Sequence, residues 1–422
     1  MTATDPRRAA ETVWRMESAS IVAVASRVLG DVGLGEEIAQ DAFVAALEQW
    51  PARGVPPNPA GWLVSTARHL AIDLVRRRST YARKLAEVGR TVSDARLDGS
   101  GEEVGDVDDV LDDHIGDDLL RLVFTTCHPV LTTESRVALT LRLLGGLTTT
   151  EVARGLLIPE TTAGQRISRA KRTLATHGVS FELPRPEEMP ERLASVLEVV
   201  YLMFNEGYVA TTGPDWARPE LCHEAIRLAR LLAALLPDER EVLALDALLE
   251  LQASRLAARV DASGAPVPLL EQDRRRWDSL LTRRGTALLG RALARPGPAT
   301  PYLLQASIAA CHALAPSAGE TDWPQIVRLY AALGSASPSP VVELNRAVAV
   351  GMAGDAEAGL ALVDRAAESP SLRDYAQVPA VRAHLLALLG RNEEARDAYR
   401  RAADLTRNGP EAALLRRRAD TL

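Results

Sequence analysis

The chain has 422 residues, of which 47% are hydrophobic and 25% charged; this composition is typical of a soluble globular protein of two to four domains and excludes a disordered one. The longest apolar runs are far too short to span a membrane, and the N-terminus lacks the apolar core of a signal peptide. We therefore expect a cytoplasmic protein with no membrane partner. Cys127, Cys222 and Cys311 form no CxxC pair, so we expect no disulfide framework, no metal site and no cofactor.

The formal net charge of −7 is unevenly distributed along the chain. Residues 1–90 carry 12 Lys/Arg against 10 Asp/Glu, residues 91–118 carry 1 against 11, and residues 119–177 carry 8 against 3. Attraction to phosphate depends on the charge of the local face and not on the total charge. A basic module that follows an acidic tether is therefore compatible with nucleic-acid binding.

The first segment, residues 9–78, is predicted to be helical with one interruption at 51–61, because the prolines of PARGVPPNPAG break a helix. Before the interruption, Glu37 and Asp41 lie four residues apart and share an outer helical face. The helical period places three apolar residues of the same segment inward: Ile38, Ala42 and Leu47.

After the proline loop, the sequence GWLVSTARHLAIDLVRRR predicts a second helix that is apolar on one side and basic on the other. Its predicted inward residues are Trp62 or Leu63, Ala67, Leu70 and Leu74, and its basic residues are Arg68, Arg76, Arg77 and Arg78. One helix with an acidic face and another with a basic, Trp-bearing face can hold a protein partner and a nucleic acid at once. The alternative is a plain three-helix bundle with solvated charges.

Residues 79–117 contain the run DARLDGSGEEVGDVDDVLDD, which is too polar and acidic to be buried and predicts a flexible linker. Residues 118–178 follow as a helix-turn-helix domain with its lead-in helices. Thr148 and Glu151 form a capping box at the start of the first helix of the pair, and Pro159 is placed to begin the second.

The second helix of this pair has an apolar face and a polar, cationic face. Its predicted inward residues are Ile167, Ala170 and Leu174, and its predicted outward residues are Gln165, Arg166, Arg169, Lys171 and Arg172. Amide and guanidinium groups on the second helix of such a pair are typical of major-groove reading. The alternative is a solvated helical hairpin with an ordinary basic face.

The C-terminal part, residues 185–422, is rich in Ala and Leu, is interrupted by Pro and Gly, and has few β-branched runs. A small-residue helix, a Gly turn at Gly354 and a second helix recur 36 residues later around Gly390. This is typical of tetratricopeptide repeats, although an Ala/Leu-rich sequence also produces such a match by coincidence. Nothing in the chain predicts a sheet, so the fold class is all-α.

Taken together, EEIAQDAFVAALEQW, WLVSTARHLAIDLVRRR, the acidic linker and a helix-turn-helix that ends in RISRAKRTL resemble the extracytoplasmic-function sigma factors of bacterial RNA polymerase. The resemblance covers residues 9–178, so residues 9–78 correspond to region two and residues 118–178 to region four. It implies core RNA polymerase and promoter DNA as partners. The residues implied to contact the polymerase are Glu37, Gln40, Asp41 and Phe43.

The resemblance also implies two sets of DNA-binding residues. Near the melted −10 element lie the 51–61 loop and the side chains Trp62, Arg68, Arg76 and Arg77. The −35 element is faced by Glu160, Thr161, Gln165, Arg166, Arg169 and Lys171. His69, Pro159 and Gly164 depart from the usual family residues, so the base preference at both elements stays open. Region three of the larger sigma factors is missing, since the acidic linker occupies its place.

The long C-terminal extension resembles the subgroup of these factors that carries a tetratricopeptide-like domain. Members of that subgroup are typically encoded near small YCII-related (DGPF) proteins, which implies such a protein as a partner. The predicted function is promoter recognition and transcription initiation, regulated through the C-terminal helical domain. The alternative is a helix-turn-helix transcriptional regulator whose C-terminal domain is a sensor or a scaffold.

An enzyme is the least expected class, because the chain has no Gly-rich phosphate loop, no HExxH and no GxSxG, and no catalytic residue is assigned. Asn205–Tyr208 reads as a candidate site, but a glycine at a helix C-terminus explains Gly207 equally well. Cys127 next to His128 predicts a buried thiol beside a helix end.

Overall fold

The computed structural model describes residues 5–90, 115–208 and 217–422. These residues form helices and loops without a strand, and one isolated bridge pairs Val260 with Pro266. None of the helices described is long and apolar enough to cross a membrane. The chain divides into two compact units, the first comprising residues up to 154 with 158–199 and the second 155–157 with 200–422. The predicted all-α fold class is confirmed.

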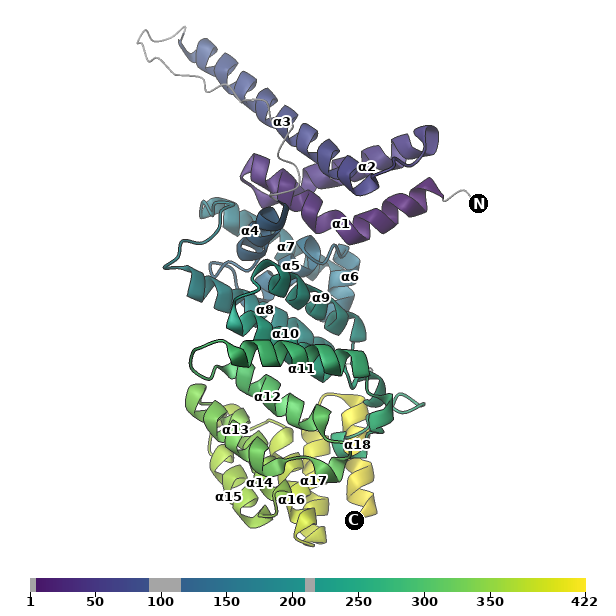
Figure 1. Cartoon of the computed structure of the whole chain (residues 1–422), viewed down its shortest axis with the longest axis vertical. Coiled ribbons are helices and arrows are strands. Elements are labelled where there is room, and N and C mark those ends of the chain that lie inside the picture. Colours follow the sequence, from purple (N-terminus) through teal and green to yellow (C-terminus); the bar gives the residue numbers. More distant parts are fainter. Residues whose placement is uncertain (1–4, 91–114, 209–216) are drawn as a thin grey trace. The chain divides into compact units, whose positions relative to one another are not determined.

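The first unit begins with three helices that pack against one another, α1 (Pro6–Leu29), α2 (Val32–Arg53) and α3 (Pro59–Arg90) (Figure 1). The prediction of a single interruption is wrong, because Gly30 (φ 67°) ends α1 and the Asp31 carboxylate begins α2. The proline interruption is also shorter than predicted and spans only 54–58. Pro51 lies inside α2, where a proline in the last turn removes few helical hydrogen bonds.

The inner face of α2 differs in register from the prediction. Ile38 and Ala42 are buried as predicted, but Leu47 is only half-buried, and the stripe continues through Ala46 and Trp50. These side chains follow the 3.6-residue period four residues apart, so the α2 stripe passes beside position 47. On α3, Leu63 and Ala67 are buried, whereas the other predicted inward residues, Trp62, Leu70 and Leu74, are half-buried.

Helix α3 continues to Arg90, so the first part of the predicted linker is helical. The acidic residues 91–114 lie outside the described residues. The chain resumes in α4 (Ile115–Thr126), followed by α5 (Thr133–Leu143), α6 (Thr149–Leu156) and α7 (Glu160–Thr176). Helix α7 packs against α5.

Helix α8 (Met189–Tyr208) extends the first unit beyond the predicted domain end at 178, because its residues up to 199 belong to that unit. The guanidinium of Arg136 on α5 donates to the hydroxyl of Ser195 and pairs with Glu198 at 3.0 Å. Ser195 Oγ donates to the carbonyl of Cys127 at 2.6 Å, and Arg192 donates to the carbonyl of Phe124 at 2.8 Å. These bonds hold the first half of α8 against α4 and α5.

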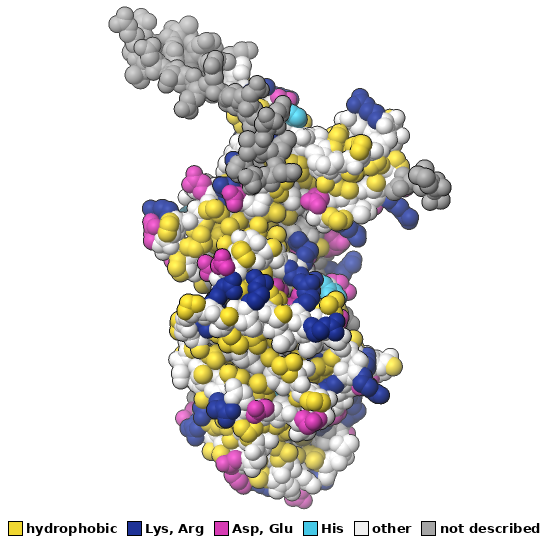
Figure 2. Space-filling view, in the orientation of Figure 1, with side chains coloured by type: hydrophobic (Ala, Val, Ile, Leu, Met, Phe, Trp, Pro, Cys, Tyr) yellow, Lys and Arg dark blue, Asp and Glu magenta, His cyan; other side chains and the backbone are white. Residues whose placement is uncertain are grey.

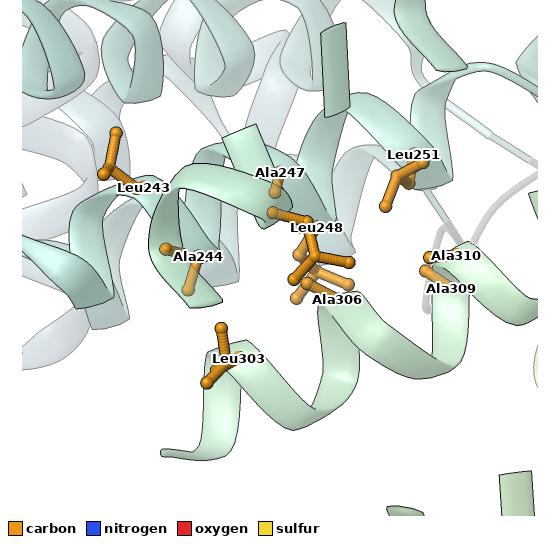
Figure 3. Packing of buried hydrophobic residues seen from close by; sticks show 11 residues of the cluster. Leu243, Ala244, Ala247, Leu248, Leu251, Leu303, Ala306, Ala309 and Ala310 are labelled. Carbon is orange, nitrogen blue, oxygen red and sulfur yellow. The ribbon is translucent and has the colours of Figure 1, made fainter. Parts of the chain in front are cut away.

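The second unit is a succession of helices joined by loops and 3₁₀ turns (Figure 1). They are α9 (Pro219–Leu235), α10 (Arg240–Ala253), α11 (Ser279–Ala294), α12 (Pro301–Leu314), α13 (Trp323–Ala336), α14 (Pro340–Met352), α15 (Ala356–Ala367), α16 (Gln377–Leu388), α17 (Asn392–Leu405) and α18 (Gly409–Thr421). Figure 3 shows how they interlock: leucines and alanines of α10, Leu248 among them, face Ala306 and its neighbours on α12.

The predicted 36-residue repeat corresponds to two successive helical hairpins. α14 and α15 form the first and α16 and α17 the second, and each hairpin turns at a glycine with positive φ, Gly354 (110°) and Gly390 (72°). Only glycine adopts such angles without strain, so the same residue recurs at both turns. Leu360, Leu385 and Ala395 join both hairpins in one buried cluster. The assignment of these hairpins as tetratricopeptide repeats stays a prediction.

The second unit carries basic side chains close together on part of its surface. On the face seen in Figure 2, dark-blue Lys and Arg side chains of this unit gather toward the end that carries α9 and α11. Helix α11 has no acidic residue and exposes Arg283, Arg284 and Arg291. The acidic composition of the C-terminal part therefore does not produce a uniformly acidic surface.

Candidate nucleic-acid and polymerase interfaces

Helix α7 buries one of its faces in the protein and exposes the opposite face to solvent. Its buried residues are Ala163, Ile167, Ala170 and Leu174, all at most 5% exposed, which confirms the predicted apolar face. The opposite face carries Thr161, Gln165, Ser168, Arg169 and Arg172, all exposed, with Arg166 half-buried beside them. One exposed helical face thus carries an amide and several guanidinium groups, the side-chain groups that proteins use to contact base edges and phosphates.

The capping box that begins α6 is present as predicted. The Thr148 N–H donates to the Glu151 carboxylate at 2.8 Å, and the Glu151 N–H donates to the Thr148 hydroxyl at 3.2 Å. The first of these bonds is the main reason why the pKa of Glu151 lies below its usual value. The Thr150 hydroxyl donates to Glu160 at 2.9 Å, which ties the start of α6 to the start of α7.

The turn between the two helices departs from the prediction in one detail. Pro159 is the capping residue before α7 and not its first helical residue, and helix α7 begins at Glu160. Leu157 in the same turn has φ 49°, a left-handed conformation that is uncommon for a residue with a side chain. The turn thus holds a modest backbone strain directly before α7.

Lys171 does not lie on the open face of α7, contrary to the prediction. Its side chain is 24% exposed, and its ammonium contacts Glu36 on α2, whose side chain is 6% exposed. Glu36 also accepts a bond from Arg142 Nε at 2.6 Å and one from Gln40 Nε2 at 2.9 Å. Lys171 therefore forms an ion pair with Glu36 and does not share the exposed face of α7 that carries Arg169 and Arg172.

The four residues implied to contact the polymerase divide into two pairs. Glu37 and Asp41 are exposed on α2, which confirms the predicted outer acidic face. Gln40 and Phe43 are half-buried: Gln40 bonds Glu36, and the Phe43 ring lies 4.9 Å from the ring of Trp14 on α1. The exposed carboxylates thus lie on a helix whose opposite face packs against α1.

The residues implied to lie near the −10 element are distributed along α3. Trp62 is half-buried, with its ring edge-on to Trp50 at 5.6 Å. Arg68 is half-buried, while Arg76 and Arg77 are exposed about two turns further along the helix. A planar ring and several cations on one rigid helix match what a single-stranded nucleic acid requires, namely a stacking surface and a basic groove.

Sequence reasoning missed the buried carboxylates Glu36 and Asp118. Asp118 on α4 is 2% exposed and pairs with Arg121 at 2.6 Å and with Arg27 of α1 at 3.5 Å. Burial raises the pKa of Asp118 despite these cations. One signal for Glu36 was available, since helical spacing places it beside the buried positions 35, 38 and 39 of α2.

The remaining motifs have structural explanations. Cys127 is 1% exposed directly after α4, as predicted, and burial raises the pKa of its thiol. Gly207 is required by close packing and not by the end of its helix: a Cβ there would lie 2.7 Å from the backbone nitrogen of Cys222. Within the described residues, no three His, Cys, Asp or Glu side chains are grouped so that they could hold a metal ion.

Comparison with known families matches three parts of the chain. Residues 14–81 match Sigma-70 region 2, residues 121–174 match Sigma-70, region 4, and residues 192–293 match a family of unknown function, DUF6596. The first two matches contain the exposed carboxylates of α2, the cationic residues of α3 and the exposed polar face of α7. No solved structure matches the chain.

Two curated relatives extend this result. The uncharacterized protein R00370 of Rhizobium meliloti (strain 1021) is 44% identical over 398 residues, which cover 94% of this chain and 92% of that protein. The probable ECF RNA polymerase sigma factor SigI of Mycobacterium tuberculosis is 29% identical over 170 residues, or 40% of this chain and 54% of that protein. Because residues 14–81 match region 2 and residues 121–174 match region 4, and part of the chain is similar to such a factor, the chain belongs to the extracytoplasmic-function family of RNA polymerase sigma factors.

Proposed function

We propose that this protein directs core RNA polymerase to a promoter by reading the −35 element with α7 and the −10 element with α3. Its family implies core RNA polymerase and promoter DNA as partners, and sigma factor families are not enzymes, so the activity is binding. The single observation that supports the proposal most is the exposed face of α7, where Gln165, Arg169 and Arg172 stand on a helix with a fully packed reverse side.

At the −35 element, the Gln165 amide and the Arg166 guanidinium have the donor and acceptor geometry for base edges in the major groove. Arg169 and Arg172 lie further along α7 and are exposed, which suits phosphate contacts that set the position of the helix. Thr161 and Glu160 at the N-terminus of α7 complete the proposed contact set.

At the −10 element, Trp62 and the 54–58 loop are proposed to receive unstacked bases, while Arg68, Arg76 and Arg77 attract the backbone. Unstacked bases gain contacts that the duplex does not offer, and this difference in binding free energy favours melting. His69 on the same helix is exposed and leaves the preferred −10 base open.

The C-terminal unit is proposed to control the access of these domains to polymerase or promoter. Stacked helical hairpins form extended binding surfaces, and a domain on the same chain acts at a high effective concentration, in the millimolar range for short flexible linkers. A small YCII-related (DGPF) protein remains a predicted partner, as the tetratricopeptide-like character of this unit remains a predicted assignment.

A charge-reversal experiment on α2 tests the proposed polymerase contact. The double substitution Glu37→Lys and Asp41→Lys reverses two exposed carboxylates on one face, and we expect loss of core-polymerase binding and of transcription in vitro. The matched control is Glu393→Lys with Asp397→Lys on α17, since these carboxylates are also exposed and four residues apart. Retention of polymerase by the α2 variant in a pull-down, with helicity unchanged, contradicts the proposal.

A further inference from the structure

Arginines of two helices form one basic surface of the second unit. Helix α11 contains no acidic residue and exposes Arg283, Arg284 and Arg291, which the helical period places within a sector of about 100°. Arg230 of α9 joins them, because its Nε lies 2.7 Å, and that of Arg284 3.3 Å, from the same oxygen of Glu250. On the face seen in Figure 2, dark-blue side chains gather near these two helices. We call Arg230, Arg283, Arg284 and Arg291 the arginine face.

The negative charge beside the arginine face is buried and does not balance it. Glu250 and Asp246 of α10 are both buried, and burial, reinforced by Glu250, raises the pKa of Asp246 to about 7. Near neutral pH, Asp246 therefore carries only part of its charge. Among the described residues, no carboxylate lies within ion-pair distance of Arg283 or Arg291, and the Arg291 guanidinium donates to the Pro237 carbonyl at 3.4 Å. The face thus keeps an excess of positive charge, and Glu250 fixes two of its arginines in place.

The surface between the arginines indicates the kind of partner. The exposed positions there carry small residues, Ala287, Gly290 and Ala294, and a Cβ added at Gly290 would meet nothing within 4 Å. Interfaces between proteins usually centre on large apolar or aromatic side chains, which are missing at these positions. Guanidinium groups above a smooth helix suit the phosphate oxygens of a nucleic-acid backbone, which they bind without regard to sequence.

The second unit adjoins the proposed DNA-reading helix in the chain. Residues 155–157 belong to this unit, and α7 begins at Glu160. Arg218, directly before α9, donates to the carbonyl of Gly155 at 2.8 Å, so the start of α9 is bound to these residues. Any duplex that α7 binds is therefore held at a high effective concentration for the arginine face.

We propose that the arginine face binds the phosphate backbone of duplex DNA that flanks the −35 element, on the side away from the −10 element. The contact adds affinity and salt dependence but no sequence preference, because phosphates are the same at every position. This inference rests on the proposed function for the place of the contact on a promoter. The affinity of the face for duplex DNA is measured without a promoter.

The first experiment uses the full chain and a labelled non-promoter duplex of about 30 base pairs, with binding measured by fluorescence anisotropy at several salt concentrations. Arg283→Gln with Arg291→Gln removes two phosphate contacts, so the logarithmic salt slope should fall by about 1.8, or about 0.9 for each contact. The matched control is Arg400→Gln with Arg401→Gln, two exposed arginines of α17, which should leave the slope unchanged.

Neither Arg283 nor Arg291 holds a buried carboxylate, so the α11 variant should keep the helicity of the native chain, as circular dichroism checks. If it does not, Arg283→Gln alone carries the test with an expected fall of about 0.9 in the slope. A slope equal to that of the native chain in the folded α11 variant overturns the inference, as does absence of duplex binding by the native chain.

A competition arm distinguishes DNA from an acidic protein as the partner. Unlabelled duplex and poly-glutamate are compared as competitors at equal total charge. Duplex DNA carries one charge per about 1.7 Å of its axis, against one per about 3.3 Å in an extended chain, so we expect it to compete better. Poly-glutamate that binds the native chain more tightly than the duplex, and loses this advantage in the α11 variant, overturns the assignment to DNA.

The second experiment uses core RNA polymerase loaded with the native chain or with either double variant. Promoter fragments end either about 5 or about 25 base pairs beyond the −35 element, and the longer fragment should raise the affinity of the native complex roughly tenfold at moderate salt. The α11 variant should lose most of this gain and keep the −35 preference. A gain equal to the native one overturns the inference, whereas a native complex without any promoter preference counts against the proposed function and leaves the first experiment to decide on the face.

Discussion

Asp246 on α10 is a buried carboxyl whose charge the second unit tolerates poorly. It is 2% exposed, Oδ1 has no hydrogen-bond partner among the described residues, and Glu250 stands one turn away. Burial, reinforced by Glu250, raises the pKa of Asp246 from 3.8 to about 7. Between these two pH values the folded state holds a proton that the unfolded state has lost, so the contribution of Asp246 to stability falls as the pH rises from about 4 to 7.

We expect Asp246→Asn to stabilise the protein more at pH 8 than at pH 5, because the cost of losing the proton of Asp246 grows between about pH 4 and pH 7. The free-energy difference between the two pH values should be on the order of 1–4 kcal/mol, since one pKa unit corresponds to about 1.4 kcal/mol. Urea denaturation of both chains at both pH values measures it, with Glu239→Gln at an exposed site as control. An equal stability change at pH 5 and pH 8 would contradict this prediction.

Gly207 and Gly290 are both helical glycines, but they have opposite surroundings. A Cβ at Gly207 would meet Cys222, Leu221 and Arg218 within 2.9 Å, whereas a Cβ at Gly290 would meet nothing within 4 Å. Gly207→Ala should therefore destabilise the protein by about 1–3 kcal/mol through overpacking. Gly290→Ala should stabilise it by about 0.5–1 kcal/mol, because alanine has the higher helix propensity. Thermal unfolding of the two variants compares them, and a shift of equal sign would be inconsistent with the packing argument.

At the scale of single elements, the proposed function assigns two kinds of DNA contact to residues of α7 that lie about one turn apart. Arg166→Ala should relax sequence preference at the −35 element and cost about 1–3 kcal/mol at the preferred sequence. Arg169→Ala should weaken binding to all sequences alike and reduce the logarithmic salt slope by about 0.9. Binding to a panel of −35 duplexes at several salt concentrations checks both expectations, with Arg400→Ala on α17 as control. Identical preference profiles for the two α7 variants would refute the division.

At the scale of the whole molecule, the first compact unit ends further along the chain than the sequence predicts. It includes residues up to 199, whereas the predicted end of the helix-turn-helix domain is residue 178. Residues 189–199 of α8 cover α4 and α5, and Arg136 loses Ser195 and Glu198 when they are absent. A fragment that ends at residue 178 should therefore unfold at lower urea concentration than one that ends at 208. The longer fragment is the proper partner for a transcription comparison with the full chain. Matching transcription at every salt concentration would contradict control by the C-terminal unit.

The parts of the site that sequence reasoning found are those encoded within one helical turn or two. The capping box at Thr148 and Glu151, the apolar face of α7 and the outer carboxylates of α2 all depend on residues three or four positions apart. The inner face of α2 was one position wrong at Leu47, because a helix offers neighbouring positions for burial and the packing against α1 and α3 selects among them.

The sequence by itself determined an all-helical chain, a helix-turn-helix with a cationic face, a preceding bundle with an acidic helix, and a C-terminal helical repeat. The sequence determines these features because the helical period, the helix caps and the glycine turns each depend on residues only a few positions apart. Only the tertiary structure decided that Lys171 pairs with Glu36, that Asp118 pairs with Arg27, and that Gly207 is a close-packing residue. Those pairings join residues tens to more than a hundred positions apart or depend on the approach of two helices, and no local pattern specifies which distant charge shares a buried site.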